Sequence, residues 1–210
     1  IGVKEVPIDK LIPNKPYFFF SHTIKKQIYN KKLLQAILEK NIQLHDYETI
    51  VNKDNIRLIG FGYFAGVIGA YNGLRALGLK QGLFDLPKAC NLKDRNEFNK
   101  ELDEIILPNI KIVLTGKGRV SSGAKEVLDY LKIKQVGVDE FLNNSFDEPV
   151  YVNIDVLDYN SRTNNNESTM AHFYKNPQEY SSTFMRFCKS SDMFIAGHYH
   201  NLKAPKLISK

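Results

Sequence analysis

Residues 110–131 read IKIVLTGKGRVSSGAKEVLDYL, and this stretch decides the fold class. An apolar run typical of a buried strand is followed by Gly116 and Gly118 and then by a segment with helical periodicity. A strand, a glycine turn and a helix in this order are typical of a dinucleotide-binding motif, but also of a tight turn in an ordinary α/β domain. The spacing alone leaves both interpretations open.

The two glycines occupy the positions where such a motif turns sharply and where its backbone approaches pyrophosphate at a helix N-terminus. Ser121 stands at the third glycine position and Gly123 follows two residues later. An acidic residue about 20 positions downstream would bind ribose hydroxyls, and Asp139 with Glu140 lies near that place or begins the next helix. The predicted cofactor-binding residues are Gly116, Gly118, Arg119, Val120, Ser121, Gly123 and Asp139.

Strand and helix patterns alternate along the rest of the chain, which indicates an α/β fold with parallel strands. Strands are expected at 16–22, 42–51, 56–62, 110–116, 134–138, 150–157 and 192–200. Helices are expected at 29–40, 63–79, 99–107, 121–133 and 177–190. In the second helix, Gly66, Gly69 and Gly73 leave a bare face, which predicts close packing against a neighbouring domain.

We place a domain boundary near the polar stretch around Pro87 and the Pro-Asn pair at 108–109. Residues 1–104 then form an N-terminal domain with a connecting helix. Residues 105–210 form a Rossmann-like parallel-sheet domain.

Composition narrows the functional classes. The net charge is +6, yet lysines are spread along the chain without basic runs interleaved with aromatics, so we expect anionic small-molecule ligands rather than nucleic acid. Cys90 and Cys188 are interpreted as unpaired thiols. No apolar stretch approaches the roughly 20 residues that span a bilayer, and no signal peptide is evident, so we expect no membrane association and a cytoplasmic location.

Four stretches carry a resemblance to a known family. They are GVKEVP (2–7), LIPNKPYFFFSHTIKKQ (11–27), IRLIGFGYFAGVIGAYNGL (56–74) and VLTGKGRVSSGA (113–124). Together they resemble the lysine–ketoglutarate reductase and saccharopine dehydrogenase (lysine-forming) family, a branch of the alanine dehydrogenase and transhydrogenase group. FFFSHTIKKQ is the most specific of these pieces.

The resemblance implies an N-terminal catalytic domain, a second domain that binds NAD or NADP, and reversible conversion of saccharopine to lysine and α-ketoglutarate. The family's acid–base pair corresponds to Lys4 of the KE motif and His22 of the SH motif. Lys25, Glu5 and Glu48 match family residues that bind substrate or tune this pair. Such a pair suits the chemistry, because oxidation of a secondary amine needs a base for the amine proton and a group that activates water.

The chain also departs from the family. Members normally begin upstream of GVKE, with a strand carrying an arginine that binds a substrate carboxylate, and continue beyond KAPKL. We therefore expect both domains to be incomplete and the chain to be a fragment. A non-catalytic nucleotide-binding or partner-binding remnant, or another amino-acid dehydrogenase of the superfamily, is the alternative.

The sequence GHYH places His198 and His200 two residues apart on an expected strand. Two histidines on one strand face can hold a metal ion, but no third ligand has a recognisable spacing. We therefore expect no metal site. The choice between NAD and NADP, the direction of the reaction and the oligomeric state are not fixed by the sequence.

Overall fold

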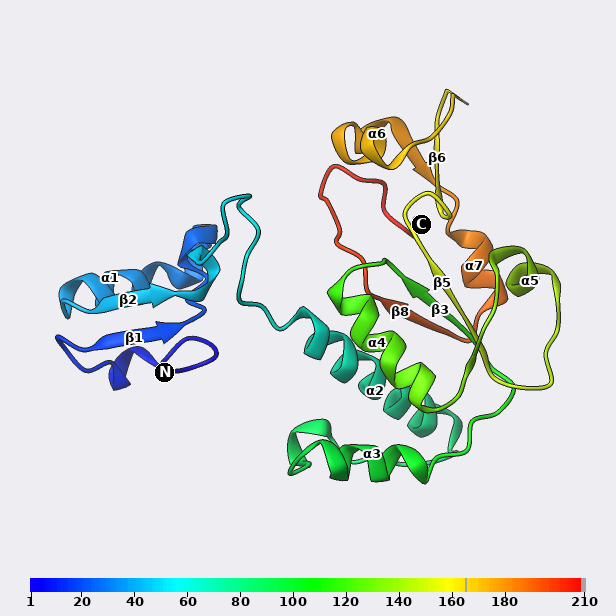
Figure 1. Ribbon diagram of the computed structural model, residues 1–210, viewed down its shortest axis with the longest axis horizontal. Helices are drawn as coiled ribbons and strands as arrows, with labels where there is room; N and C mark the ends of the chain where they lie inside the picture. Colours follow the sequence, from blue (N-terminus) through cyan, green and yellow to red (C-terminus); the bar gives the residue numbers. More distant parts are fainter. Residues whose placement is uncertain (165, 209–210) are drawn as a thin grey trace. The chain divides into compact units, whose positions relative to one another are not determined.

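A computed structural model describes residues 1–164 and 166–208. The chain forms two compact units, Ile1–Phe61 and Gly62–Lys210, which are considered separately (Figure 1). Both contain parallel strands joined through helices, which confirms the α/β fold class. The predicted boundary at 104/105 is not the boundary between these units, because the helices before it pack in the core of the second unit.

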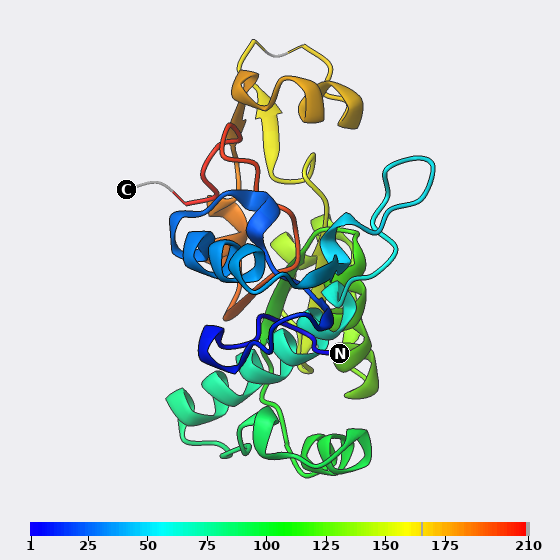
Figure 2. The same ribbon diagram turned by 90° about the vertical axis from the view of Figure 1, so that its left-hand side faces the viewer.

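The first unit is a small βαβ arrangement (Figure 2). Strand β1 (Pro16–Phe19) and strand β2 (Gln43–Asp46) pair in parallel and are connected through helix α1 (Lys31–Glu39). The apolar side of α1 packs on β1, and the buried core consists of Leu11, Phe19, Leu33, Ala36 and Ile37. Short 3-10 helices lie at Ile8–Lys10, Thr23–Lys25, Ile28–Asn30 and Tyr47–Thr49.

The expected strand at 56–62 is wrong. This segment makes an isolated antiparallel bridge between Val51 and Arg57, and Ile56 and Leu58 expose 59% and 61% of their surface. Without an apolar layer over it, this segment does not form a strand of the sheet.

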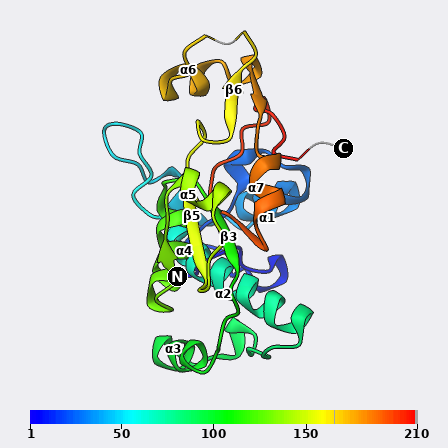
Figure 3. The ribbon, with the colours of Figure 1, turned by 90° about the vertical axis from the view of Figure 1, so that its right-hand side faces the viewer.

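The second unit is built on a four-stranded parallel sheet in the order β4-β5-β3-β8. Figure 3 labels its two central strands, β5 and β3. Its strands are β3 (Lys111–Thr115), β4 (Lys134–Gln135), β5 (Val150–Ile154) and β8 (Met193–Ala196). The alternation of β3 supplies both faces, since Ile112 and Leu114 join one core cluster and Val113 joins the other. Helices α2 (Gly62–Gln81), α3 (Arg95–Asp103) and α4 (Arg119–Tyr130) cover the first face, and α5 (Val138–Asn143) and α7 (Met185–Ser190) cover the second.

Helices α2 and α4 pack with their backbones in close approach. A Cβ atom at Gly66 would lie 1.8 Å from the carbonyl oxygen of Val120, and one at Gly123 would lie 1.9 Å from that of Tyr63. The expected close packing of α2 is therefore confirmed at Gly66, but the partner is a helix of the same unit rather than a neighbouring domain. Gly69 faces open space.

The expected helix at 177–190 is wrong in its first half. Strand β7 (Tyr180–Ser182) pairs antiparallel with β6 (Asn160–Arg162), so the helical segment is reduced to α7. A further helix, α6 (Met170–Lys175), precedes it. Within the described residues, no helix is both long and apolar enough to cross a membrane.

Candidate active site

The carboxyl ends of the strands in the first unit gather the predicted acid–base residues. The segment before Lys4 runs along β1, where the Gly2 amide donates to Phe18 O (2.8 Å) and the Phe20 amide donates to Val3 O (3.1 Å). Lys4 and Glu5 thus leave the same edge as the residues that follow β1 and β2. Parallel strands place their carboxyl ends together, which is where open α/β sheets bind ligands.

His22 is held in an uncommon backbone conformation. Its φ of 56° lies in the left-handed region, which costs a non-glycine residue roughly 1–2 kcal/mol. Its Nδ1 lies 2.8 Å from Oε1 of Glu5, and the two side chains are 19% and 32% exposed. Strained residues of this kind concentrate at functional sites. The structure therefore brings together two of the predicted residues, Glu5 and His22.

A buried polar network that the sequence analysis missed fixes this corner. The hydroxyl of Ser21 donates to Oδ2 of Asp46, the Thr23 amide donates to Ser21 Oγ over 3.1 Å, and the Glu48 amide donates to Asp46 Oδ1 over 2.9 Å. Ser21 and Asp46 are both buried. For Ser21 the available signal was its place directly after the apolar run 16–20, whereas Asp46 lay inside the strand expected at 42–51.

Glu48 is a buried carboxylate between two cations. Its Oε1 lies 3.5 Å from Nζ of Lys25 and 3.2 Å from a guanidinium nitrogen of Arg57, and its side chain is 1% exposed. Its Oε2 has no hydrogen-bond partner among the described residues. The structure thus joins two of the selected residues, Lys25 and Glu48, and adds Arg57, which the sequence analysis did not select.

Lys4 lies against the aromatic residues of the same unit. Its Nζ lies 5.8 Å from the centroid of the Phe61 ring, and that ring packs edge-on against Phe20 at 5.0 Å. The Phe20 ring is 6.5 Å from the ring of His22. Lys4 is exposed and its ammonium group lies over the Phe61 ring, so it is available to a substrate.

In the second unit, the glycine turn follows β3 as predicted. Gly116 has φ of 92°, and its Cβ would lie 2.8 Å from Gly197 O, so the fold itself requires glycine there. Gly118 differs, because its backbone is extended and an added Cβ would meet no atom within 4 Å. The fold does not require a glycine at position 118, whereas a ligand that approaches the backbone there would require one.

The first turn of α4 follows directly on Gly118. No side chain of the described residues caps this helix, so the amides of its first turn remain available to an anion. The exposed positions here are Lys117, Gly118 and Arg119. An uncapped helix start beside an open glycine fits the phosphates of a nucleotide.

Asn153 on β5 stabilises the glycine turn through hydrogen bonds of its side chain. Its Nδ2 lies 2.9 Å from Gly116 O and 3.0 Å from Ser121 Oγ, and Nζ of Lys117 donates to Asn153 O over 2.7 Å. The sequence analysis missed Asn153, although an asparagine inside the apolar run VYVNI was a signal. The buried side chain of Ser121 supports the turn, while Gly123 serves the contact with α2.

The strand order bears on the prediction that Asp139 binds the cofactor. It is exposed in the first turn of α5, after β4, and β5 separates β4 from β3. The acidic residue that follows the strand adjacent to β3 is Asp155. The expected strand reaching the GHYH motif ends at Ala196, so His198 and His200 lie beyond it.

The two histidines of the GHYH motif have no third metal ligand beside them among the described residues. Within residues 1–164 and 166–208, no group of three His, Cys, Asp or Glu side chains is placed to hold a metal ion. His198 instead pairs through Nδ1 with the hydroxyl of Thr115 at 2.6 Å.

Comparison with known proteins gives relatives over about two thirds of the chain, whereas no family model matches. Alpha-aminoadipic semialdehyde synthase of Bos taurus is 36% identical over 154 residues, covering 65% of this chain and 17% of the relative. The Arabidopsis thaliana protein of that name is 31% identical over 149 residues, covering 62% and 14%. Saccharopine dehydrogenase [NAD(+), L-lysine-forming] of Candida glabrata is 28% identical over 152 residues, covering 67% and 40%.

Among solved structures, an L-alanine dehydrogenase is similar with a TM-score of 0.42 and 18% identity, covering 85% of this chain and 44% of that one. The chain spans less than half the length of each of these proteins. The resemblance seen in the motifs is confirmed by the sequence relatives: the chain is a homologue of the lysine–ketoglutarate reductase and saccharopine dehydrogenase enzymes.

Proposed function

We propose that the chain is part of an NAD(P)-dependent oxidoreductase of lysine metabolism that interconverts saccharopine with lysine and α-ketoglutarate. The observation that carries the proposal is the pair formed by His22 and Glu5 at a left-handed turn, beside the motif that also supplies Lys4. Sequence relatives named for saccharopine dehydrogenase support the reaction class.

The geometry suggests how the chain's own residues handle protons. A carboxylate only accepts hydrogen bonds, so Glu5 favours the imidazole tautomer with hydrogen on Nδ1 and leaves Nε2 of His22 to exchange a proton. Lys4 and His22 then divide the work: one removes the proton of the secondary amine, and the other activates water for addition to the imine. Lys25 and Arg57, which share Glu48, provide positive charge for substrate carboxylates.

The second unit supplies the proposed cofactor site. A bound nicotinamide dinucleotide would accept hydride from the carbon next to the substrate nitrogen. Open space at Gly118 and the uncapped start of α4 fit its pyrophosphate. For the ribose hydroxyls we propose Asp155, which follows the strand beside β3, with Asp139 as the alternative expected from spacing.

The test is a coupled measurement of turnover and binding. Lysine and α-ketoglutarate together should oxidise NADH or NADPH, followed at about 340 nm, and neither should do so alone. Calorimetry with each cofactor is run in parallel. Cofactor binding without turnover for any amino acid and keto acid pair would favour a non-catalytic module, and turnover with a different pair would favour another amino-acid dehydrogenase.

The cytoplasmic location stays a prediction. The bovine relative carries the word mitochondrial in its name. Fractionation of cells producing the tagged full-length protein distinguishes the two compartments.

A further inference from the structure

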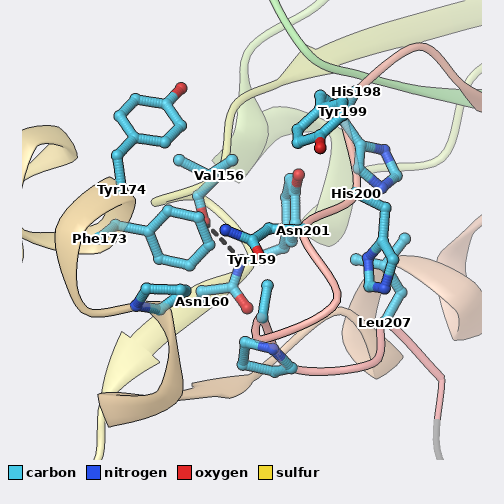
Figure 4. A pocket seen from close by; sticks show the side chains of 13 residues that line it. Val156, Tyr159, Asn160, Phe173, Tyr174, His198, Tyr199, His200, Asn201 and Leu207 are labelled. Carbon is cyan, nitrogen blue, oxygen red and sulfur yellow. Dashed lines mark hydrogen bonds between the residues drawn. The ribbon is translucent and has the colours of Figure 1, made fainter. Parts of the chain in front are cut away.

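A pocket in the second unit is lined by residues that have no role in the proposed oxidoreductase site (Figure 4). Helix α6 contributes Phe173 and Tyr174 to one side, and the segment after β8 contributes His198 and Tyr199 to the other. Tyr159 and Asn160, which follow β5, also line it. These six residues define what is called here the aromatic pocket, whose inner volume is about 90 Å³.

Two buried polar atoms of the aromatic pocket have no partner among the described residues. They are the hydroxyl of Tyr159 and Oδ1 of Asn160, on residues that are 2% and 5% exposed. The amide nitrogen of Asn160 is satisfied, because it donates to Val156 O over 2.9 Å. A buried polar atom without a partner is unfavourable and in native proteins usually indicates a bound molecule or a special role. One potential donor and one acceptor thus belong to two residues that line the same pocket.

The aromatic pocket favours uncharged occupants. None of its described lining residues is a lysine, arginine, aspartate or glutamate. Burial, with Asp155 nearby, raises the pKa of Tyr159 and keeps its hydroxyl protonated. Burial also lowers the pKa of His198, which favours the neutral imidazole. A charged group entering here would lose its hydration without gaining an ionic partner.

We propose that the aromatic pocket binds a small neutral planar ring that carries a carboxamide or a comparable pair of hydrogen-bonding groups. Tyr159 would donate to its carbonyl oxygen and Asn160 Oδ1 would accept from its N–H, while Phe173 contributes an aromatic surface. The volume sets the size: an apolar cavity of about 150 Å³ holds benzene, and the inner volume here, about 90 Å³, is smaller. The occupant therefore inserts its amide and part of its ring, and the rest of the ring lies at the exposed rim formed by Tyr174 and Tyr199.

The aromatic pocket also contacts the glycine turn. His198 lines the pocket and pairs with Thr115, the last residue of β3, and its backbone lies 2.9 Å from where a Cβ of Gly116 would be. The same ring chemistry thus has two sources: the base of a nucleotide held at the turn, or a separate small metabolite. The pocket itself does not depend on the proposed oxidoreductase activity.

The direct test is titration of the protein with benzamide, nicotinamide and toluene, observed by ligand-detected NMR. Benzamide and nicotinamide should bind with millimolar affinity, and toluene, which lacks both hydrogen-bonding groups, should bind roughly tenfold more weakly. Tyr159→Phe removes only the unpartnered hydroxyl, so it should leave stability unchanged or slightly higher. It should weaken the two amides roughly three- to tenfold and leave toluene unaffected.

Tyr130→Phe is the matched control. It removes a hydroxyl that binds Asp103 outside the aromatic pocket, and amide binding should stay at the wild-type value. NADH is then added as a competitor: displacement of benzamide identifies a nucleotide base as the source, and simultaneous binding identifies a separate metabolite. The proposal is overturned if no probe binds at tens of millimolar, or if folded Tyr159→Phe protein binds benzamide as the wild type does.

Discussion

Nδ1 of His22 lies 2.8 Å from Oε1 of Glu5, and this contact joins residues from two separate chain segments at the edge of one small sheet. A charge-assisted hydrogen bond of this kind is roughly twice as strong as a neutral one. We expect Glu5→Gln to lower kcat of the proposed lysine-forming reaction about tenfold and Glu5→Ala to lower it further, because the imidazole loses its orientation. Steady-state kinetics measure both, with the exposed Glu39→Gln as control. Unchanged kcat in both Glu5 variants would exclude a positioning role.

Replacing either proposed acid–base residue should remove activity while the fold persists. His22→Asn is the appropriate change, since asparagine tolerates the left-handed backbone. Lys4→Ala removes an exposed side chain. Each should lower kcat by about 10²–10⁴-fold, the usual contribution of general acid–base catalysis. Lys10→Ala, another exposed lysine, controls for charge, and circular dichroism checks folding. Full activity in either variant would contradict the assignment of that residue.

Gly118 separates a nucleotide site from a structural turn. In Gly118→Ala the new methyl group meets no protein atom, so the free energy of unfolding should stay level or rise slightly. If pyrophosphate approaches this backbone, the Kd for NADH should increase by roughly tenfold or more. Calorimetry and urea unfolding give the two quantities. Unaltered NADH affinity in the folded variant would mean that no phosphate lies at this position.

The contact between α2 and α4 predicts opposite effects for glycines of one helix. Gly66→Ala would place a methyl group 1.8 Å from Val120 O, so the helices must separate, and we expect a loss of about 1–3 kcal/mol. Gly69→Ala is the matched control, since its methyl group enters open space and alanine is favoured over glycine in a helix by up to about 1 kcal/mol. Urea unfolding should give lower stability for the first and higher stability for the second. A stable Gly66→Ala protein would contradict the close packing.

The local sequence pattern was sufficient to predict those elements whose apolar and glycine residues form a distinct motif. The strand, turn and helix around Gly116 appear where the apolar run, the glycines and the helical periodicity placed them. The proposed acid–base residues were selected through motif resemblance, because a lone histidine after a strand is usually structural. Its grouping with Glu5 follows from parallel strands ending at one edge.

Elsewhere, pairing between strands that are distant in the sequence determined a structure that the local pattern did not predict. The segment before α7 has helical spacing, yet Tyr180 is buried against Phe173 and its strand pairs with β6. Likewise, Asp139 follows β4, which is separated from β3 because β5 lies between the two strands. The spacing of residues along the sequence does not predict this strand order. Residues such as Asn153 and Arg57 gain their roles from contacts across the unit and were not recognisable as a motif.

The buried imidazole of His198 predicts a loss of stability in mild acid. Burial, reinforced by the nearby His200, lowers the pKa of His198 below the ordinary 6.5, so the folded protein binds this proton less tightly than the unfolded chain. The free energy of unfolding should therefore fall as pH decreases below 6.5, until the folded pKa is passed, and should not depend on this group at higher pH. His198→Asn keeps a polar partner for Thr115 without a titrating ring. Urea midpoints at about pH 7.5 and pH 5 should show a smaller acid loss in this variant than in the wild type, since carboxylate titration is common to both. An equal loss in the two proteins would show that protonation of His198 does not oppose folding.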